Sequence, residues 1–260
     1  MSLQTLTGDQ FLPNAWRLET RVSVDSTNAE AAKRARAGEP AGYAITSREQ
    51  TAGRGRSGRA WSTGDNDLAL SILLRPQLKP AAAAAAGFVA ALAVYDLARD
   101  VLPSTAPLAI KWPNDVLIGD RKLSGILAEA ASGADGHVDW LVLGMGVNLA
   151  PQQHVAVPHA IDLETAGGPR LRPEDAAALL LANLDHWISQ WLGQGFEPIR
   201  QAWRNRARDL GKPVVARLPN ETVEGVALDL AVDGALVLQL ADGAERRISA
   251  GDVFPLAKGS

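Results

Sequence analysis

The residues most suited to chemistry lie in one short stretch, residues 53–59, where three glycines alternate with arginines. The stretch has neither a helical nor a strand period. Glycine lets backbone N–H groups approach a ligand closely, and each arginine offers a planar fork of donors that matches carboxylate or phosphate. Because like charges held together repel one another unless a ligand neutralises them, the pattern predicts a loop that closes over an anion.

Two familiar phosphate loops are excluded by context. Gly53, Gly55 and Gly58 match the spacing of the dinucleotide fingerprint, but that motif opens a helix, whereas residues 59–67 are polar, rich in turn formers and lead to a strand. A Walker loop is excluded because no Gly-Lys-Ser/Thr follows. The structural alternative is a solvated basic turn.

A lysine and an acidic residue flank a proline in the segment Lys111-Trp112-Pro113-Asn114-Asp115. Lys111 ends a strand and suits a phosphate, and the Asp115 carboxylate suits Mg²⁺, which prefers oxygen ligands. A surface Asn-Asp turn with an incidental lysine is the alternative.

Lys122 and a glycine-rich strand end add to the candidate site. Lys122 precedes an apolar run, so it is either a snorkelling surface residue or a partner for a ligand carboxylate. Gly144 and Gly146, followed by Asn148, allow close approach to the backbone, or else form a bulge with a turn asparagine.

Composition excludes several classes of protein. The 260 residues carry a net charge of −3, 47% are hydrophobic and none is cysteine, so disulfides, thiolate ligands and a cysteine nucleophile are excluded. The acidic balance argues against a general nucleic-acid binder. Residues 1–14 lack a signal-peptide pattern, and the alanine-rich run at residues 80–94 is too short and too weakly hydrophobic to span a bilayer. A cytoplasmic protein is expected. The four histidines show no metal-binding or acid–base spacing.

Periodicity and turn signals predict a mixed α and β chain. Thr27 and Glu30 fit a capping box at the start of a helix that runs to residue 36, and the proline- and glycine-rich residues 151–170 suggest a mobile loop. Helices are also predicted at 80–102, 173–192 and 198–210, and strands at 16–24, 43–47, 68–74, 108–112, 116–118, 122–130, 140–148, 214–218, 223–230, 235–240 and 244–248.

Changes in composition and residue pattern along the chain divide the sequence into three parts. Residues 1–15 form a loosely ordered lead-in and residues 16–210 a main domain. After Gly211 short strands alternate with Asp-Gly and Pro-Asn turns, which predicts a small β domain over residues 211–260.

Taken in order, the motifs resemble those of the biotin–protein ligases, and in particular the biotin–[acetyl-CoA-carboxylase] ligases. They are Ser26-Thr27-Asn28, the Gln-x-Ala-Gly-Arg-Gly-Arg run that begins at Gln50, Lys-Trp-Pro-Asn-Asp, Arg-Lys-x-x-Gly-Ile and Gly-x-Gly-x-Asn. The resemblance covers about residues 16–255. It implies an α+β fold, with a class II synthetase-like catalytic domain of mixed sheet flanked by helices and a C-terminal SH3-like β-barrel.

The resemblance also implies a reaction. ATP and Mg²⁺ activate biotin to biotinyl-5′-AMP with release of pyrophosphate, and biotin then passes to a lysine of a biotin carboxyl carrier protein. Only about fifteen residues precede the catalytic domain, so the DNA-binding activity of bifunctional relatives is expected to be absent, as is membrane association. A homodimer is possible through exposed strand edges near residues 138–147.

Residue roles follow from the same resemblance. Lys111, Arg54, Arg56 and Lys122 are the expected catalytic residues, and Asp115 is the expected Mg²⁺ ligand. The expected biotin site comprises Ser26, Thr27, Asn28, Gln50, Gly53, Arg54, Gly55, Arg56, Lys122, Gly125, Gly144 and Gly146. The expected ATP site comprises Arg56, Arg59, Trp61, Lys111, Asn114, Asp115 and Asn148.

Two other functions stay open. A lipoate–protein ligase has the same catalytic fold, and only the loop at residues 53–59 favours biotin. From a different class, a non-catalytic module would use the basic loop to hold an anionic partner and would form no adenylate. A transferase that uses a cysteine nucleophile is excluded because the chain has no cysteine.

Overall fold

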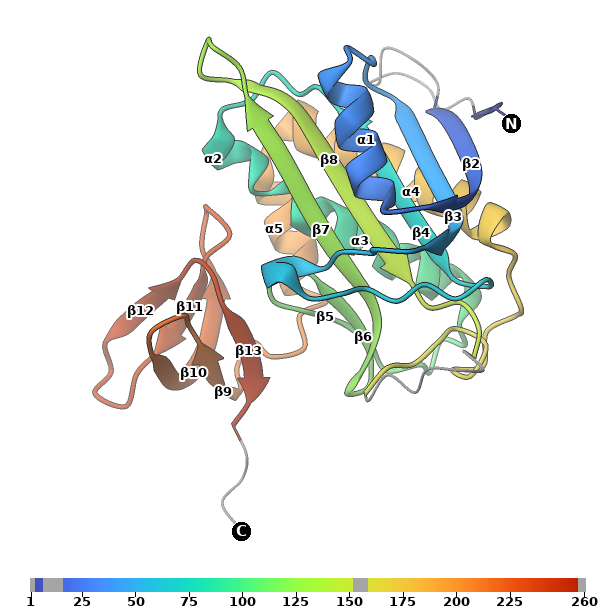
Figure 1. Cartoon of the computed structure of the whole chain (residues 1–260). Helices are drawn as coiled ribbons and strands as arrows, with labels where there is room; N and C mark the ends of the chain where they lie inside the picture. Colours follow the sequence, from blue (N-terminus) through green and yellow to red (C-terminus); the bar gives the residue numbers. More distant parts are fainter. Residues whose placement is uncertain (1–2, 7–15, 152–158, 257–260) are drawn as a thin grey trace.

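The computed structural model describes residues 3–6, 16–151 and 159–256 of the chain. Its central element is an eight-stranded sheet in the order β1-β2-β3-β4-β8-β7-β6-β5 (Figure 1). Only β2 and β3 are parallel, since a helix connects them, and every other neighbouring pair is antiparallel. The strands are β1 (Leu3–Leu6), β2 (Trp16–Val24), β3 (Tyr43–Gln50), β4 (Leu68–Leu74), β5 (Leu108–Lys111), β6 (Asp115–Ile118), β7 (Arg121–Ser132) and β8 (Val138–Val147).

Helices cover both faces of this sheet (Figure 1). On one face α1 packs through Ala31, Ala32 and Ala35, whose small side chains let the helix lie close to the sheet. On the other face α3 and α4 bury one large apolar core against the strands. The helices are α1 (Thr27–Arg36), α2 (Pro80–Ala83), α3 (Ala86–Val101), α4 (Pro173–Gln194) and α5 (Phe196–Arg204).

The start of α1 differs from the predicted capping box. Ser26 is the N-cap, and its Oγ accepts a hydrogen bond from the Ala29 amide at 3.4 Å. Thr27 is already helical, and its N–H and hydroxyl both donate to Gln50 Oε1, at 2.9 and 3.2 Å. The prediction was wrong because the side chain at the end of β3 competes for Thr27. This contact fixes the first turn of α1 beside β3.

The alanine-rich segment forms two helices, with a break at Ala84 and Ala85, where one helix was predicted. By length and composition Pro80–Val101 is apolar enough to cross a membrane, which the sequence prediction denied. However, 67% of the apolar window is buried inside the domain, and the core helix of a globular protein passes the same test.

A second, five-stranded antiparallel sheet forms the C-terminal unit, in the order β12-β11-β10-β9-β13. It confirms the predicted α+β class with a small SH3-like C-terminal domain. Four strands were predicted, and the fifth, β13, was missed. The strands are β9 (Pro213–Arg217), β10 (Thr222–Leu230), β11 (Leu236–Gln239), β12 (Glu245–Ile248) and β13 (Asp252–Pro255).

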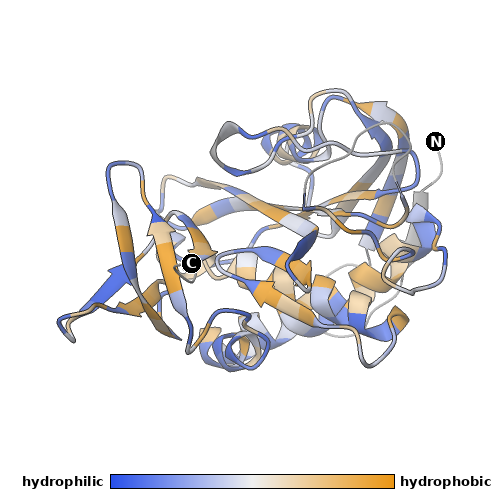
Figure 2. Cartoon of the chain, turned by 90° about the horizontal axis from the view of Figure 1, so that it is seen from below, coloured by the Kyte–Doolittle hydropathy of each residue, from blue (hydrophilic) through white to orange (hydrophobic). Residues whose placement is uncertain are grey.

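The C-terminal unit packs directly on the main sheet and its helices. Trp112 Nε1 donates a hydrogen bond to the Gly234 carbonyl at 3.0 Å. A Cβ at residue 234 would lie 2.7 Å from Phe88 Cε2, and φ there is +84°, so this turn requires glycine. In Figure 2 the apolar residues concentrate on strands and on the helices packed against them, whereas the loops are mostly hydrophilic.

The structure bears on three predictions about chain organisation, with a different outcome for each. Residues 3–6 of the expected lead-in form a strand paired with β2, and residues 1–2 and 7–15 lie outside the described residues. Within the expected mobile loop, Ile161 and Leu163 are buried, and residues 152–158 lie outside the described residues. The expected free edge near residues 138–147 is wrong, because β8 pairs with β4 on one side and with β7 on the other. The boundaries at residues 15 and 210 stay predictions.

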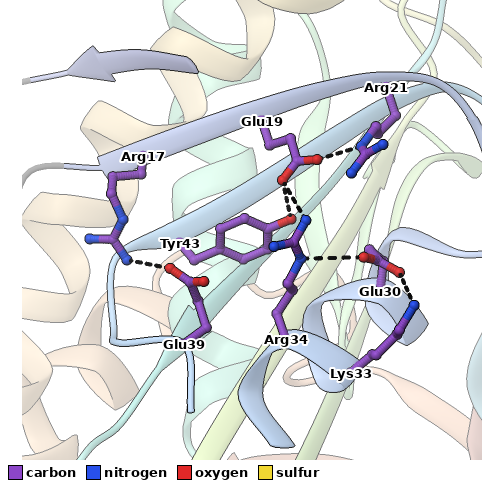
Figure 3. A network of polar contacts seen from close by, with 8 residues as sticks. All are labelled: Arg17, Glu19, Arg21, Glu30, Lys33, Arg34, Glu39 and Tyr43. Carbon is purple, nitrogen blue, oxygen red and sulfur yellow. Dashed lines mark hydrogen bonds and ion pairs between the residues drawn. The ribbon is translucent and has the colours of Figure 1, made fainter. Parts of the chain in front are cut away.

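A buried carboxylate ties β2, β3 and α1 together (Figure 3). Glu19 is 2% exposed and accepts hydrogen bonds from Arg21, from Arg34 at 3.3 Å and from the Tyr43 hydroxyl at 2.9 Å. Burial raises the pKa of Tyr43, and the hydrogen bond to Glu19 raises that pKa further. The phenol therefore stays protonated and keeps donating to Glu19, which anchors α1 to the sheet.

We expect Glu19→Ala to lower the free energy of unfolding by roughly 2–3 kcal/mol, since it leaves the buried Tyr43 hydroxyl without its acceptor and removes one of the two carboxylates that Arg34 contacts. Equilibrium denaturation in urea measures this. Glu39→Ala is the matched control, because its ion pair with Arg17 is more exposed and should cost less than about 1 kcal/mol. Equal effects of the two substitutions would contradict the assigned role of Glu19.

Candidate active site

One cavity of about 220 Å³ lies where α1, β3, the strands β5 to β8, the loop at residues 53–59 and β13 meet. Its lining combines cations, amides, glycines and a few apolar side chains. The lining residues are Ser26, Thr27, Asn28, Gln50, Arg54, Gly55, Arg56, Arg59, Ala60, Trp61, Ala69, Lys111, Trp112, Pro113, Asn114, Asp115, Lys122, Gly125, Ile126, Leu127, Gly144, Met145, Gly146, Asp252 and Val253.

Asn28 is the polar residue most firmly held in this cavity. It is buried, and its Oδ1 accepts from the Ser71 hydroxyl at 2.6 Å. Its Nδ2 donates to Glu129 Oε2 at 2.9 Å and to the Leu127 carbonyl at 3.3 Å. The α1 N-terminus thus forms the helix cap and also lines the cavity, and the expected contact of Ser26, Thr27 and Asn28 with biotin stays a prediction.

The glycines of β7 and β8 create space that larger residues would fill. A Cβ at Gly144 would lie 1.9 Å from Asn28 Oδ1, and one at Gly146 would lie 2.2 Å from the Trp61 ring. A Cβ at Gly125 would be 3.0 Å from both Trp61 and the Lys122 ammonium. Glycine is therefore needed here so that side chains from α1 and the loop can lie directly on the strands.

The loop at residues 53–59, called the arginine loop below, folds back on itself. Gly55 N–H donates to the Arg59 carbonyl at 2.7 Å, and Trp61 N–H donates to the Gly53 carbonyl at 2.9 Å. Arg56–Gly58 form one turn of 3₁₀ helix at the tip. A Cβ at Gly53 would lie 2.3 Å from the Trp61 carbonyl oxygen, so Gly53 lets the two arms of the loop meet.

The arginines of the loop differ in their hydrogen-bond acceptors, although Arg56 also lies 3.9 Å from Asp252, the partner of Arg59. Arg54 pairs with Glu129 at 3.1 Å. Arg56 donates to Asn114 Oδ1 at 2.6 Å and to the Gly251 carbonyl at 2.9 Å, and Asn114 itself donates to the Ile126 carbonyl.

Arg59 pairs with Asp252 of β13 at 2.8 Å, so the C-terminal unit holds the tip of the loop. Burial raises the pKa of Asp252, but its hydrogen bond with Arg59 and the charges of Arg59 and Arg56 outweigh burial and hold that pKa below its usual range. The carboxylate is therefore ionised at neutral pH. Its contact with the loop is lost only as the pH falls through the lowered pKa.

The two lysines of the cavity lie in different surroundings. Lys122 pairs with Asp115 at 2.8 Å. The Lys111 ammonium lies 4.6 Å from the centre of the Phe254 ring. Burial lowers the pKa of Lys111, and the nearby Asp115 charge opposes this. The cavity therefore carries two lysine cations, one already neutralised by a carboxylate.

All the site residues predicted from sequence line this cavity except Gly53 and Asn148. Gly53 shapes the arginine loop, as described above. Asn148 instead donates from its side chain to the Lys122 and Ile161 carbonyls, at 3.3 and 3.0 Å, and holds the chain after residue 159 against β7. Its expected contact with ATP stays a prediction.

The sequence prediction missed two acidic residues of the site, Glu129 and Asp252. Glu129 lies two and four residues beyond Leu127 and Gly125 on β7, so the period of two along a strand was a usable signal for it. Asp252 carried no such signal, because it comes from the C-terminal unit and is 193 residues from its partner Arg59.

The donors present fit Mg²⁺ only when it arrives with phosphate. Among the described residues no three His, Cys, Asp or Glu side chains gather as a metal site. Mg²⁺ in nucleotide sites usually takes one or two carboxylates together with substrate phosphates. Asp115 supplies one such carboxylate, provided that its pairing with Lys122 opens.

Comparison with known proteins agrees with this geometry. Residues 21–148 match the model of the biotin/lipoate A/B protein ligase family, and residues 209–254 match the biotin protein ligase C-terminal domain. A biotin–[acetyl-CoA-carboxylase] ligase of Paracoccus denitrificans is 40% identical over 236 residues, which cover 89% of this chain and 97% of the relative.

Solved structures show the same fold. The biotin protein ligase of Aquifex aeolicus in complex with biotin and ATP has a TM-score of 0.77 at 23% identity, covering 92% of this chain and 99% of that one. The biotin protein ligase of Leishmania major in complex with biotinyl-5-AMP has a TM-score of 0.62 at 27% identity, covering 90% and 98%. The chain belongs to the biotin/lipoate A/B protein ligase family.

We expect Asp252→Asn to make the arginine loop about twofold to fivefold more susceptible to trypsin, because the loop loses an ion pair that restrains it. Fragments that end at Arg54, Arg56 or Arg59 are counted over time by mass spectrometry. Asp233→Asn is the matched control, since it removes an ion pair with Arg247 in the same C-terminal unit. If the loop is cleaved equally faster in the control, or no faster in Asp252→Asn than in the wild type, Asp252 does not restrain the arginine loop.

Proposed function

We propose that this protein is an ATP-dependent biotin–protein ligase that forms biotinyl-5′-AMP and then transfers biotin to a carrier-protein lysine. The observation that carries the proposal is the gathering of five cations beside a glycine-lined sheet in one cavity, in a chain 40% identical to a biotin–[acetyl-CoA-carboxylase] ligase over most of its length. The five cations are Arg54, Arg56, Arg59, Lys111 and Lys122.

In the first step the biotin carboxylate attacks the α-phosphorus of ATP, and pyrophosphate leaves. Two anions must meet, so the site must neutralise charge. Lys122 receives the biotin carboxylate, which replaces Asp115 as its partner. In the structure Asp115 Oδ1 lies 2.8 Å from Lys122 Nζ. When the biotin carboxylate takes over this contact, the Asp115 carboxylate is released and faces the nucleotide. When bound, Mg²⁺ neutralises phosphate charge, and Asp115 is the residue that would hold it.

The other cations stabilise the charge that builds on the α-phosphoryl group. Lys111 and Arg56 border the cavity beside Asn114 and supply fixed donors, which is the largest contribution in such reactions. The arginine loop then excludes water, because an acyl adenylate hydrolyses when it is exposed. Arg54 is positioned for this role at the mouth of the loop, where Glu129 holds it.

The two ends of the adenylate are assigned to different sides of the cavity. The biotin head group contacts Gln50 and the N-terminal end of α1, and it lies along the glycines of β7 and β8. The nucleotide contacts Trp61, Arg59 and the segment at residues 111–115. The biotin side comprises Ser26, Thr27, Asn28, Gln50, Gly55, Gly125, Gly144 and Gly146, and Gly53 shapes the loop beside them.

In the second step the acceptor lysine attacks the carbonyl carbon of the mixed anhydride, an amide bond forms and AMP leaves. A carboxylase acceptor is supported by the Paracoccus denitrificans relative, which is a biotin–[acetyl-CoA-carboxylase] ligase. We propose that the acceptor is a biotin carboxyl carrier protein and that the reaction takes place in the cytoplasm.

The function itself is tested by pyrophosphate release. With ATP and Mg²⁺ the protein should release pyrophosphate when biotin is present and should label a biotin carboxyl carrier protein on lysine. Lipoate in place of biotin should give no product. Pyrophosphate release with lipoate but not with biotin would identify a lipoate ligase. No pyrophosphate release with either acid would identify a non-catalytic module.

We expect Lys111→Ala to slow biotin-dependent exchange between ATP and pyrophosphate about a hundredfold, because it removes one transition-state donor. The exchange assay reports this first step without a carrier protein. Lys33→Ala is the matched control, because Lys33 is exposed on α1 and does not line the cavity, so exchange should be unchanged. Near-normal exchange in Lys111→Ala would overturn the role of Lys111.

A further inference from the structure

Lys111 differs from the other four cations of the cavity in what holds it. Arg54, Arg59 and Lys122 each have a carboxylate partner, and Arg56 donates to Asn114. In the part of the chain that the structure describes, the Lys111 ammonium has no hydrogen bond or ion pair. Instead, the ammonium makes a cation–π contact with the aromatic ring of Phe254, whose centre is 4.6 Å from Nζ.

The carboxylate best placed to pair with Lys111 is engaged elsewhere. Asp115 lies opposite Lys111 in the β5–β6 ladder. Its Oδ1 is 2.8 Å from Lys122 Nζ, so the second lysine takes this acceptor. As a result Lys111 is a partly buried cation that has no ion pair among the described residues. Burial lowers its pKa, and the charges of Asp115, Asp209 and Asp252 oppose this without contacting it.

Phe254 reaches Lys111 from the C-terminal unit. It lies on β13, two residues after Asp252, and residues two apart on a strand point to the same side of the sheet. Asp252 contacts the arginine loop and Phe254 contacts Lys111, so this side of β13 touches two parts of the cavity wall, although Phe254 itself does not line the cavity. The β9–β13 ladder, in which Phe254 pairs with Val215, holds the strand in place.

An aromatic face holds an ammonium group in a way that a carboxylate does not. The ring attracts the cation through its quadrupole but does not cancel its charge, and the N–H groups that point away from the ring stay available. A lysine held in this way is directed yet still able to bind a phosphate. A carboxylate at the same place would compete with the incoming anion.

We propose that Phe254 is a positioning residue for adenylate formation, holding the Lys111 ammonium toward the reacting phosphate. This rests on the proposed function, since it assumes that Lys111 acts on ATP. The small C-terminal domain thereby takes part in the first chemical step, although none of its residues belongs to the sequence motifs of the site.

The ring also contacts a second cation, which provides a control. The Arg217 guanidinium carbon lies 4.6 Å from the centre of the same ring. Arg217 is exposed on β9 and does not line the cavity. Arg217→Gln therefore removes a cation–π contact of Phe254 without changing Lys111.

The test measures biotin-dependent exchange between ATP and pyrophosphate in the full-length protein. Phe254→Leu keeps apolar volume but removes the aromatic face, and we expect kcat to fall about fivefold to thirtyfold while KM for biotin changes less than about twofold. Phe254→Trp should restore most of the loss, and Arg217→Gln should leave kcat unchanged. Thermal melting confirms that each variant is folded, and Phe254→Met replaces Phe254→Leu if the latter does not fold.

A double-mutant cycle decides whether Phe254 acts through Lys111. In a Lys111→Gln background, Phe254→Leu should cause little further loss, because the ring no longer has a cation to hold. An undiminished loss in that background, or wild-type kcat in Phe254→Leu, would overturn the proposal. If the wild-type protein itself shows no exchange, the proposed function fails instead.

Discussion

Repulsion between like charges is the constraint on which the site depends. Five cations surround a cavity of about 220 Å³, and without an anionic ligand their charges must be balanced by the protein. The balancing groups come from separate places in the fold: Glu129 from β7, Asp115 from β6, Asp252 from β13 and the Asn114 amide after β5. They keep the site assembled while leaving the cations free to change partners.

The sheet provides the second requirement, which is a surface without side chains. β7 and β8 lie inside the eight-stranded sheet: β8 pairs with β4 and β7, and β7 pairs with β8 and, over residues 121–125, also with β6. This rigid pairing lets glycines line the cavity without loosening it. Asn28 and Trp61 then lie directly on Gly144 and Gly146, which brings the α1 terminus and the arginine loop onto the same surface.

The C-terminal unit is part of this arrangement as well as a separate sheet. Trp112 donates to the Gly234 carbonyl, and β13 contacts both the arginine loop and Lys111. The segment that carries Lys111 and Asp115 is therefore held between two sheets. A change in how the small domain packs would therefore alter the position of Lys111.

The sequence by itself determined the elements and most of the site. The bounds of β2 and β4 and the class of the long helices follow from local periodicity. Glycine and charge spacing identified the arginines, lysines and glycines of the cavity, and the family resemblance added Ser26, Thr27, Asn28 and Gln50. Tertiary structure alone decided the N-cap at Ser26, the internal position of β8, and the contacts of Asp252 and Phe254. Those outcomes depend on groups far apart in the chain, such as Arg59 and Asp252, 193 residues apart, whose meeting is set by sheet order and domain packing and leaves no local pattern.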